Sequence, residues 1–301
     1  MTASWIVALS FFTVSTVLLT SGINALQSNS QAPANRVFFA LTMAIAIWSA
    51  GMALSAAAAT AAAGEVFRRI SAVGWSTAYA ILLHLILVVT GKVKQKRSFM
   101  VLLYTPALLG LLAFAVPGKL NPRPYLLQQT AYGWINVAQH NLWDWFFYAY
   151  YLGYSLFALW LLARWEGATQ DQAEKKKART LFLAILSALA LGTLTDVILS
   201  SIFSAWPQMA PLIMLVPVLS IDHALKKDSF QVTEGVNRKT NYITLFASVL
   251  LYIILTALQL LRAREIGPLG LVKCPPLSRH KFNIYPNTSS LNDLSFPLFY
   301  S

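Results

Sequence analysis

Residues 4–26 read SWIVALSFFTVSTVLLTSGINAL, a run without a single Asp, Glu, Lys or Arg. A helix needs about 20 mostly apolar residues to cross a hydrocarbon core of about 30 Å, so this run is long enough to span a membrane. The residues before it contain no basic stretch, and no convincing small-residue cleavage site follows. We therefore interpret the run as a retained helix and not as a signal peptide.

Further apolar runs follow along the chain, and most of them are equally poor in charge. They lie at about 37–60, 70–90, 99–116, 142–162, 181–203, 208–224 and 242–261. The run at 208–224 is short and contains Pro211 and Pro217, so we expect a kinked helix there. Only 11% of the chain is charged, whereas a soluble domain has about a quarter. The sequence predicts an all-α, polytopic membrane helix bundle of seven helices plus an eighth apolar segment.

The basic residues lie between the apolar runs and are unevenly divided between the two sides. With the N-terminus outside, the inner connections hold Arg36 and the basic clusters within 92–97, 164–179 and 226–239. The outer connections then hold only Arg68, Arg69, Lys119 and Arg123. Because inner loops are enriched in Lys and Arg, we predict an external N-terminus. The net charge of +12 is thus distributed as an orientation signal, and we expect no nucleic acid as a partner.

The longest external connection, 117–141, and the aromatic helix start after it form a candidate ligand site. The connection contains Trp134 and His140, and the following helix begins with Trp143 and Asp144. Aromatic rings at a helix end are typical of an interfacial belt at the headgroup level. A second interpretation is that connection and belt together close a pocket for a small external ligand. The sequence leaves both interpretations open.

Asp196 is the clearest ionisable side chain inside an apolar run, and we expect it near the middle of 181–203. Ionisable groups in spanning segments are costly and often functional. Asp196 is either a ligand contact or a hydrogen-bonded carboxyl that ties helices together. His84 is a lone histidine on an apolar helix, which is typical of a packing residue with a hydrogen bond. We predict no metal site, because no set of ligands converges, and no cofactor.

Three stretches of aromatic and small residues carry a resemblance to a known family. They are NRVFF at 35–39 with AIWSAGMAL at 46–54, FRRISAVGW at 67–75 with His84, and KAR at 177–179 with LGTLTDVIL at 191–199, Pro207 and Pro211. The pattern resembles the seven-transmembrane sensor region at the N-terminus of many bacterial histidine kinases and diguanylate cyclases. The resemblance covers about residues 4–228. It implies a bacterial cytoplasmic membrane protein that senses a signal and passes it to a cytoplasmic output domain.

The sequence after residue 228 departs from that family. Residues 229–264 read as a linker and the eighth apolar segment, and residues 265–301 as a disordered or non-native tail. We find no Gly-rich phosphate loop and no kinase or cyclase motif, and so expect no enzymatic activity. The sequence predicts a sensor domain at 4–228 that is truncated or acts through a cytoplasmic partner, with a homodimer as a further expectation. A small transporter or channel is the alternative function.

Overall fold

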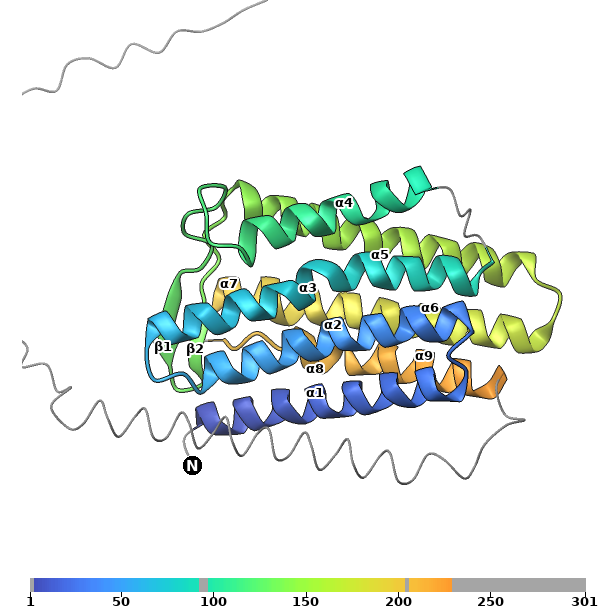
Figure 1. The fold of residues 1–301 in the computed structure, drawn as a ribbon, viewed down its shortest axis with the longest axis horizontal. Helices are drawn as coiled ribbons and strands as arrows, with labels where there is room; N and C mark the ends of the chain where they lie inside the picture. The colour runs from blue at the N-terminus through green and yellow to red at the C-terminus, as the bar shows by residue number, and fades with distance from the viewer. Residues whose placement is uncertain (1–2, 92–96, 204–205, 229–301) are drawn as a thin grey trace, which may run out of the picture.

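The computed structural model describes residues 3–91, 97–203 and 206–228. The predictions for 229–264 and 265–301 lie outside the described residues. The described part is a bundle of long helices that run along one common direction, with a small β-hairpin at one end (Figure 1). We refer to this end of the bundle as the hairpin end.

The helices follow the apolar runs in order. They are α1 (Ala3–Ser28), α2 (Pro33–Ala56), α3 (Ala61–Val89), α4 (Arg97–Phe114), α5 (Leu142–Ala168), α6 (Gln172–Thr193), the π-helical η1 (Leu194–Leu199), α7 (Ser200–Ile202), α8 (Ala210–Ile213) and α9 (Leu215–Asp228). Among the described residues, α1, α2, α3, α5 and the joined α6–η1 are long and apolar enough to cross a membrane, whereas α4 and α8–α9 are apolar but shorter. The predicted helical membrane bundle is confirmed, while the count of seven spans stays a prediction.

The connection 117–141 departs from the all-α prediction. Within it, β1 (Leu127–Thr130) pairs with antiparallel β2 (Gly133–Asn136). Gly133 has a φ of +95°, and a Cβ on it would lie 2.1 Å from the carbonyl oxygen of Ala56. Only glycine therefore lets this turn dock on the end of α2. The strands are short and their turn lacks the Asn-Gly or Asp-Gly pair that signals a hairpin, which is why the sequence did not predict them.

The third helix begins earlier than the predicted 70–90, because α3 starts at Ala61. Thr60 caps the helix by accepting a hydrogen bond from the Ala63 amide at 3.2 Å, so α3 begins at Ala61. Arg68 and Arg69 consequently lie within α3 and not in an outer connection. The alanines at 61–63 have high helix propensity and favour this early start.

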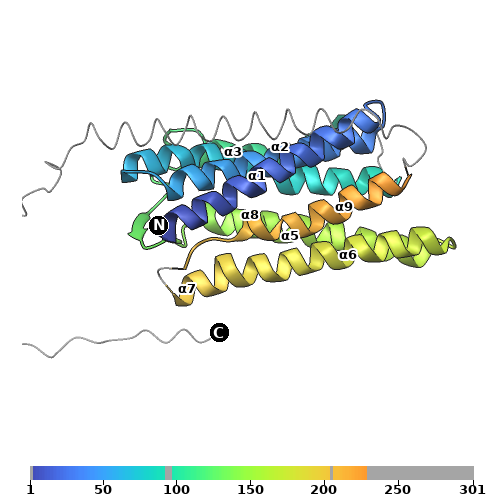
Figure 2. The ribbon, with the colours of Figure 1, turned by 90° about the horizontal axis from the view of Figure 1, so that it is seen from below.

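Helices α1, α2 and α3 pack into what we call the α1–α3 wall. A Cβ on Gly51 would lie 2.6 Å from the amide nitrogen of Ser71, and one on Gly74 would lie 2.2 Å from the carbonyl oxygen of Ala44. The backbones of α2 and α3 therefore touch where glycine leaves room, as small residues allow in membrane helices. Figure 2 shows this wall on one side of the bundle, with α6 and α9 on the other.

The chain between α6 and α9 is less regular. Regular helix passes into the π-helical η1, then into the short α7, and returns to helix only at α8. The predicted kink in 208–224 is confirmed as a break at Met214 between α8 and α9. Pro211 and Pro217 lie in the first turns of α8 and α9, where the missing amide of proline costs no internal hydrogen bond.

Candidate functional site

A cavity of about 160 Å³ lies between α3, α5, α6–η1 and α8 and reaches the hairpin end. Within the described ranges, its charged lining side chains are Arg68, Asp144 and Asp196. Much of the remaining wall is aromatic, with Trp75 and Tyr79 from α3 among its rings. A mostly apolar cavity with a few convergent polar groups is the usual form of a small-molecule site.

Asp196 joins two segments at the cavity wall. Its Oδ1 accepts hydrogen bonds from the Met209 amide at 2.7 Å, the Ala210 amide at 3.1 Å and the Thr195 hydroxyl at 2.8 Å. It lies in η1, close to the hairpin end, and not near the middle of its span as the sequence predicted. The reason is that Asp171 caps α6, so that the helix begins at Gln172, well before residue 181. π-Helical turns often occur at functional sites, which fits this position.

Arg68 is a buried cation of α3, whereas the sequence predicts it in an outer connection. Its side chain is only 6% exposed. Nε donates to the Ser55 hydroxyl at 3.2 Å, Nη1 to the Gln208 side chain and the Met52 sulfur, and Nη2 to the Trp134 carbonyl at 3.0 Å. Arg68 thus links α2, α3, the hairpin and the segment before α8. Its spacing from Ala72 and Trp75, four and seven residues on, was the signal that it shares their inward face.

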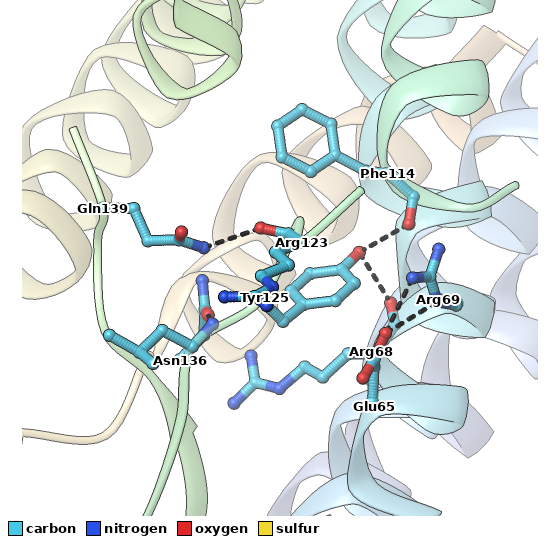
Figure 3. Close-up of polar contacts among 9 residues, drawn as sticks. Glu65, Arg68, Arg69, Phe114, Arg123, Tyr125, Asn136 and Gln139 are labelled. Atoms are coloured by element: carbon cyan, nitrogen blue, oxygen red, sulfur yellow. Dashed lines mark hydrogen bonds and ion pairs between the residues drawn. The ribbon is translucent and has the colours of Figure 1, made fainter. Parts of the chain in front are cut away.

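Tyr125 holds the chain before the hairpin against α3 and α4. Its hydroxyl donates to the Phe114 carbonyl at 3.0 Å and the Arg68 carbonyl at 3.3 Å (Figure 3). Burial raises the pKa of the Tyr125 hydroxyl well above its usual value, and the opposing effect of the Arg68 charge is smaller. The hydroxyl therefore remains a donor at physiological pH. Arg69, next to Arg68, turns instead to Glu65 and forms an ion pair at 2.7 Å.

Asp144 is held at the cavity wall by the start of α5. Asn141 accepts hydrogen bonds from the Trp143 and Asp144 amides at 2.9 and 3.0 Å. Asp144 Oδ2 accepts in return from the Asn141 amide at 3.4 Å and from the Gln139 amide at 3.1 Å. This capping box fixes the direction of the carboxylate.

The other candidate site residues, Trp134, His140 and Trp143, do not line the cavity. The Trp134 indole donates to the Ala58 carbonyl at 2.9 Å, and the Trp143 indole donates to the Leu120 carbonyl at 3.0 Å. His140 is exposed, with a φ of 53°. Asp144 and Asp196 therefore line the same cavity. The two tryptophans instead attach the hairpin segment to the chain around it.

His84 lies apart from this cavity, between α3 and α4. Its Nδ1 is 2.8 Å from the Tyr104 hydroxyl, a hydrogen-bond distance. The prediction that His84 is a packing residue with a hydrogen bond is confirmed.

Comparison with known proteins bears on the whole bundle. A family described as the N-terminal 7TM region of histidine kinase matches residues 8–221, which include all three charged side chains of the cavity. No match was found among curated proteins or among solved structures. The family match spans well over half of the chain and agrees with the bundle of apolar helices. The chain therefore belongs to the family of N-terminal 7TM regions of histidine kinases, a family of membrane sensing modules.

Proposed function

We propose that this protein binds a small external ligand in the cavity at the hairpin end and passes the signal through α9 to the cytoplasm. The observation that carries the proposal is the double role of Asp196, which lines the cavity and accepts hydrogen bonds from the Met209 and Ala210 amides. These amides begin α8, which leads directly into α9. A ligand that binds Asp196 changes its hold on α8 and so favours another position of α9.

The proposal includes an orientation in a bacterial cytoplasmic membrane. The connection between α5 and α6 lies opposite the hairpin end and is followed by Lys175, Lys176 and Lys177. Such basic clusters favour the cytoplasmic side. The hairpin, the cavity and the N-terminus then lie outside. With α4 and α8–α9 counted as spans, the bundle has seven, and the end of α9 lies inside. We propose that the sensor is homodimeric and that its signal reaches a cytoplasmic output module beyond the inner end of α9.

The cavity can be filled without knowledge of its ligand. Tyr148→Cys, in a Cys274→Ser background, places a thiol on the cavity wall of α5. A membrane-impermeant methanethiosulfonate added from outside then occupies the cavity covalently. We expect the adduct to change amide hydrogen exchange in residues 215–228, because the cavity and α9 are coupled. Trp145→Cys is the matched control, since Trp145 lies on the same helix and is 59% exposed.

Two results of this experiment contradict the proposal. The first is labelling of Tyr148→Cys only after the membrane is permeabilised, which would put the cavity inside. The second is the same hydrogen exchange in 215–228 with the adduct at either position, which would separate the cavity from α9.

A small transporter is the second candidate, because the helix is interrupted at Met214, between α8 and α9. Transporter sites are often formed by broken helices whose ends face the substrate, and Ala210 at the start of α8 lies on this cavity. Reconstituted vesicles distinguish the two functions. A sensor binds its ligand without net flux, whereas a transporter accumulates it, and Asp196→Ala abolishes that accumulation.

A further inference from the structure

The charged groups of the cavity are out of balance. The described lining contains one guanidinium, that of Arg68, and two carboxylates, those of Asp144 and Asp196. The charges of Arg68 and Asp196 offset one another, which leaves the carboxylate of Asp144 uncompensated. A ligand with one positive charge restores neutrality in the cavity, whereas an anion adds a second uncompensated negative charge.

Hydrogen-bonding capacity points in the same direction. Arg68 already donates to Ser55, Met52, Gln208 and the Trp134 carbonyl, which uses most of its N–H groups within the protein. The carboxylates have more hydrogen-bonding capacity left for a ligand. Asp144 Oδ1 accepts no hydrogen bond from any residue in the described ranges, and the Oδ2 of Asp196 accepts only a shared one from Ala210 at 3.2 Å. The site therefore offers free carboxylate oxygens to a ligand, whereas the guanidinium of Arg68 is largely used within the protein.

The aromatic wall gives a third, independent reason. The ring of Phe147 lies 4.5 Å from that of Trp75, 6.1 Å from Tyr79 and 5.5 Å from Tyr151, measured between centroids. All four rings line the cavity. The face of an aromatic ring attracts a cation within about 6 Å of its centroid, and the attraction grows when water is excluded. A group of rings beside carboxylates is suited to an alkylated ammonium ion, whose methyl groups pack on the rings.

The size of the cavity limits the ligand. Its volume of about 160 Å³ is close to that of an engineered cavity of about 150 Å³ that holds benzene. The body of the ligand therefore has only a few carbon atoms, and a peptide or a lipid does not fit inside.

From the charge balance, the free carboxylate oxygens and the adjoining rings, we propose that the cavity binds a small organic monocation such as an alkylated amine. The inference rests on the proposed function, because it names the ligand class of the same cavity. Asp144 and Asp196 supply the negative charge, and the rings of α3 and α5 enclose the alkyl groups.

The test uses three probes of nearly the same shape and different charge. Tetramethylammonium, tert-butanol and pivalate are titrated against the full chain in lipid nanodiscs, with tryptophan fluorescence as the readout, since Trp48 and Trp75 line the cavity. We expect saturable binding of tetramethylammonium, about tenfold tighter than that of tert-butanol, and weaker binding of pivalate. Equal binding of cation and alcohol, tighter binding of pivalate, or no saturable binding of the cation would overturn the proposal.

A pair of matched variants assigns the charge. Asp144→Asn removes the carboxylate and keeps an oxygen for the Gln139 and Asn141 amides, so the cap of α5 survives. We expect it to reduce the preference for the cation over the alcohol severalfold. Asp171→Asn removes a carboxylate at the N-terminus of α6, far from the cavity, and leaves a good capping residue. The same preference in both variants contradicts the assignment. The thiol-adduct experiment is independent of probe charge, so a failure of the ligand class is distinguishable from a failure of the proposed function.

Discussion

The α1–α3 wall and the helices from α5 to α9 differ in how closely their backbones approach. In the wall, Gly51 and Gly74 lie where a neighbouring backbone leaves no room for a Cβ, whereas Gly153 and Gly192 of α5 and α6 have nothing within 4 Å of that position. In the most apolar stretches of the wall helices α1, α2 and α3, 44%, 61% and 56% of the residues are buried, compared with 39% in α5 and 22% in α6. The same chain thus forms one tightly packed half and one loosely packed half, with the cavity between them.

The polar contacts follow the same division. In the wall, the Ser49 and Ser15 hydroxyls donate across helices to the carbonyls of Phe11 at 2.6 Å and Ala46 at 3.0 Å. In the other half, polar contacts such as those of Asp196 hold a π-helical turn and a broken helix. Helices change between two discrete arrangements more easily where their packing is incomplete than in a close-packed core. The difference suggests that the wall is the fixed reference against which α6–α9 move.

The largest effect is expected from Gly74→Ala in the wall. A Cβ there would meet the Ala44 carbonyl and the Trp48 amide, both of them backbone atoms. We expect a loss of roughly 3 kcal/mol in the free energy of unfolding, because helices α2 and α3 must separate. The measurement is unfolding by SDS in mixed micelles, followed by circular dichroism.

Gly153→Ala is the control for this substitution. It meets no atom within 4 Å and gains helix propensity, so it should be neutral or stabilise the protein by up to about 1 kcal/mol. If both variants unfolded at the same SDS fraction, the wall would not be the close-packed half.

A smaller effect is expected where the two halves meet, at Arg68. Arg68→Leu leaves the Gln208 side chain and the Trp134 carbonyl without their donor, at a cost of about 2 kcal/mol. Arg68→Lys keeps the charge but not the planar fork, and should lie between Arg68→Leu and the unaltered protein. Protease cleavage between residues 117 and 141 reports detachment of the hairpin. Cleavage at the unaltered rate in Arg68→Leu would show that Arg68 does not hold the hairpin.

The smallest effect is expected from Thr195→Val within the π-helical η1. It removes one of the hydrogen bonds to Asp196 and keeps those from Met209 and Ala210. Polar contacts between membrane segments contribute about 0.6 kcal/mol on average. We expect a loss of that size and faster hydrogen exchange in residues 209–214.

Thr180→Val is the reference for Thr195→Val. Thr180 lies on α6, and within the described part of the chain its hydroxyl donates only to the Lys176 carbonyl of its own helix. Indistinguishable hydrogen exchange in 209–214 for the two valine variants would show that the Thr195 hydroxyl does not stabilise this segment.

The membrane bundle and the order of its helices could be predicted because long apolar runs have few alternatives to helix in lipid. The position of Arg68 could not, because a basic residue beside an apolar run is usually read as part of a connection. The aromatic run after Asn141 combines the two predicted roles, an interfacial belt and a pocket wall. Trp145 points outward, whereas Phe147 and Tyr148 line the cavity. Which ring takes which role depends on the rotation of α5, which its neighbours set. The hydrogen bonds of Asp196 to Met209 and Ala210 depend on the course of the chain after α7 and leave no periodic signal.

The most direct test of the account measures whether Asp196 sets the position of α9. Spin labels replace Arg36 and His223, two exposed residues on α2 and α9, in a Cys274→Ser background, and pulsed EPR gives the distance between them. We predict that Asp196→Ala shifts or broadens the distribution of distances, and that Asp196→Asn, which keeps an acceptor oxygen, does so less. Asp171→Asn should leave the distribution unchanged. An Asp196→Ala distribution identical to that of the unaltered protein would contradict the coupling of the cavity to α9.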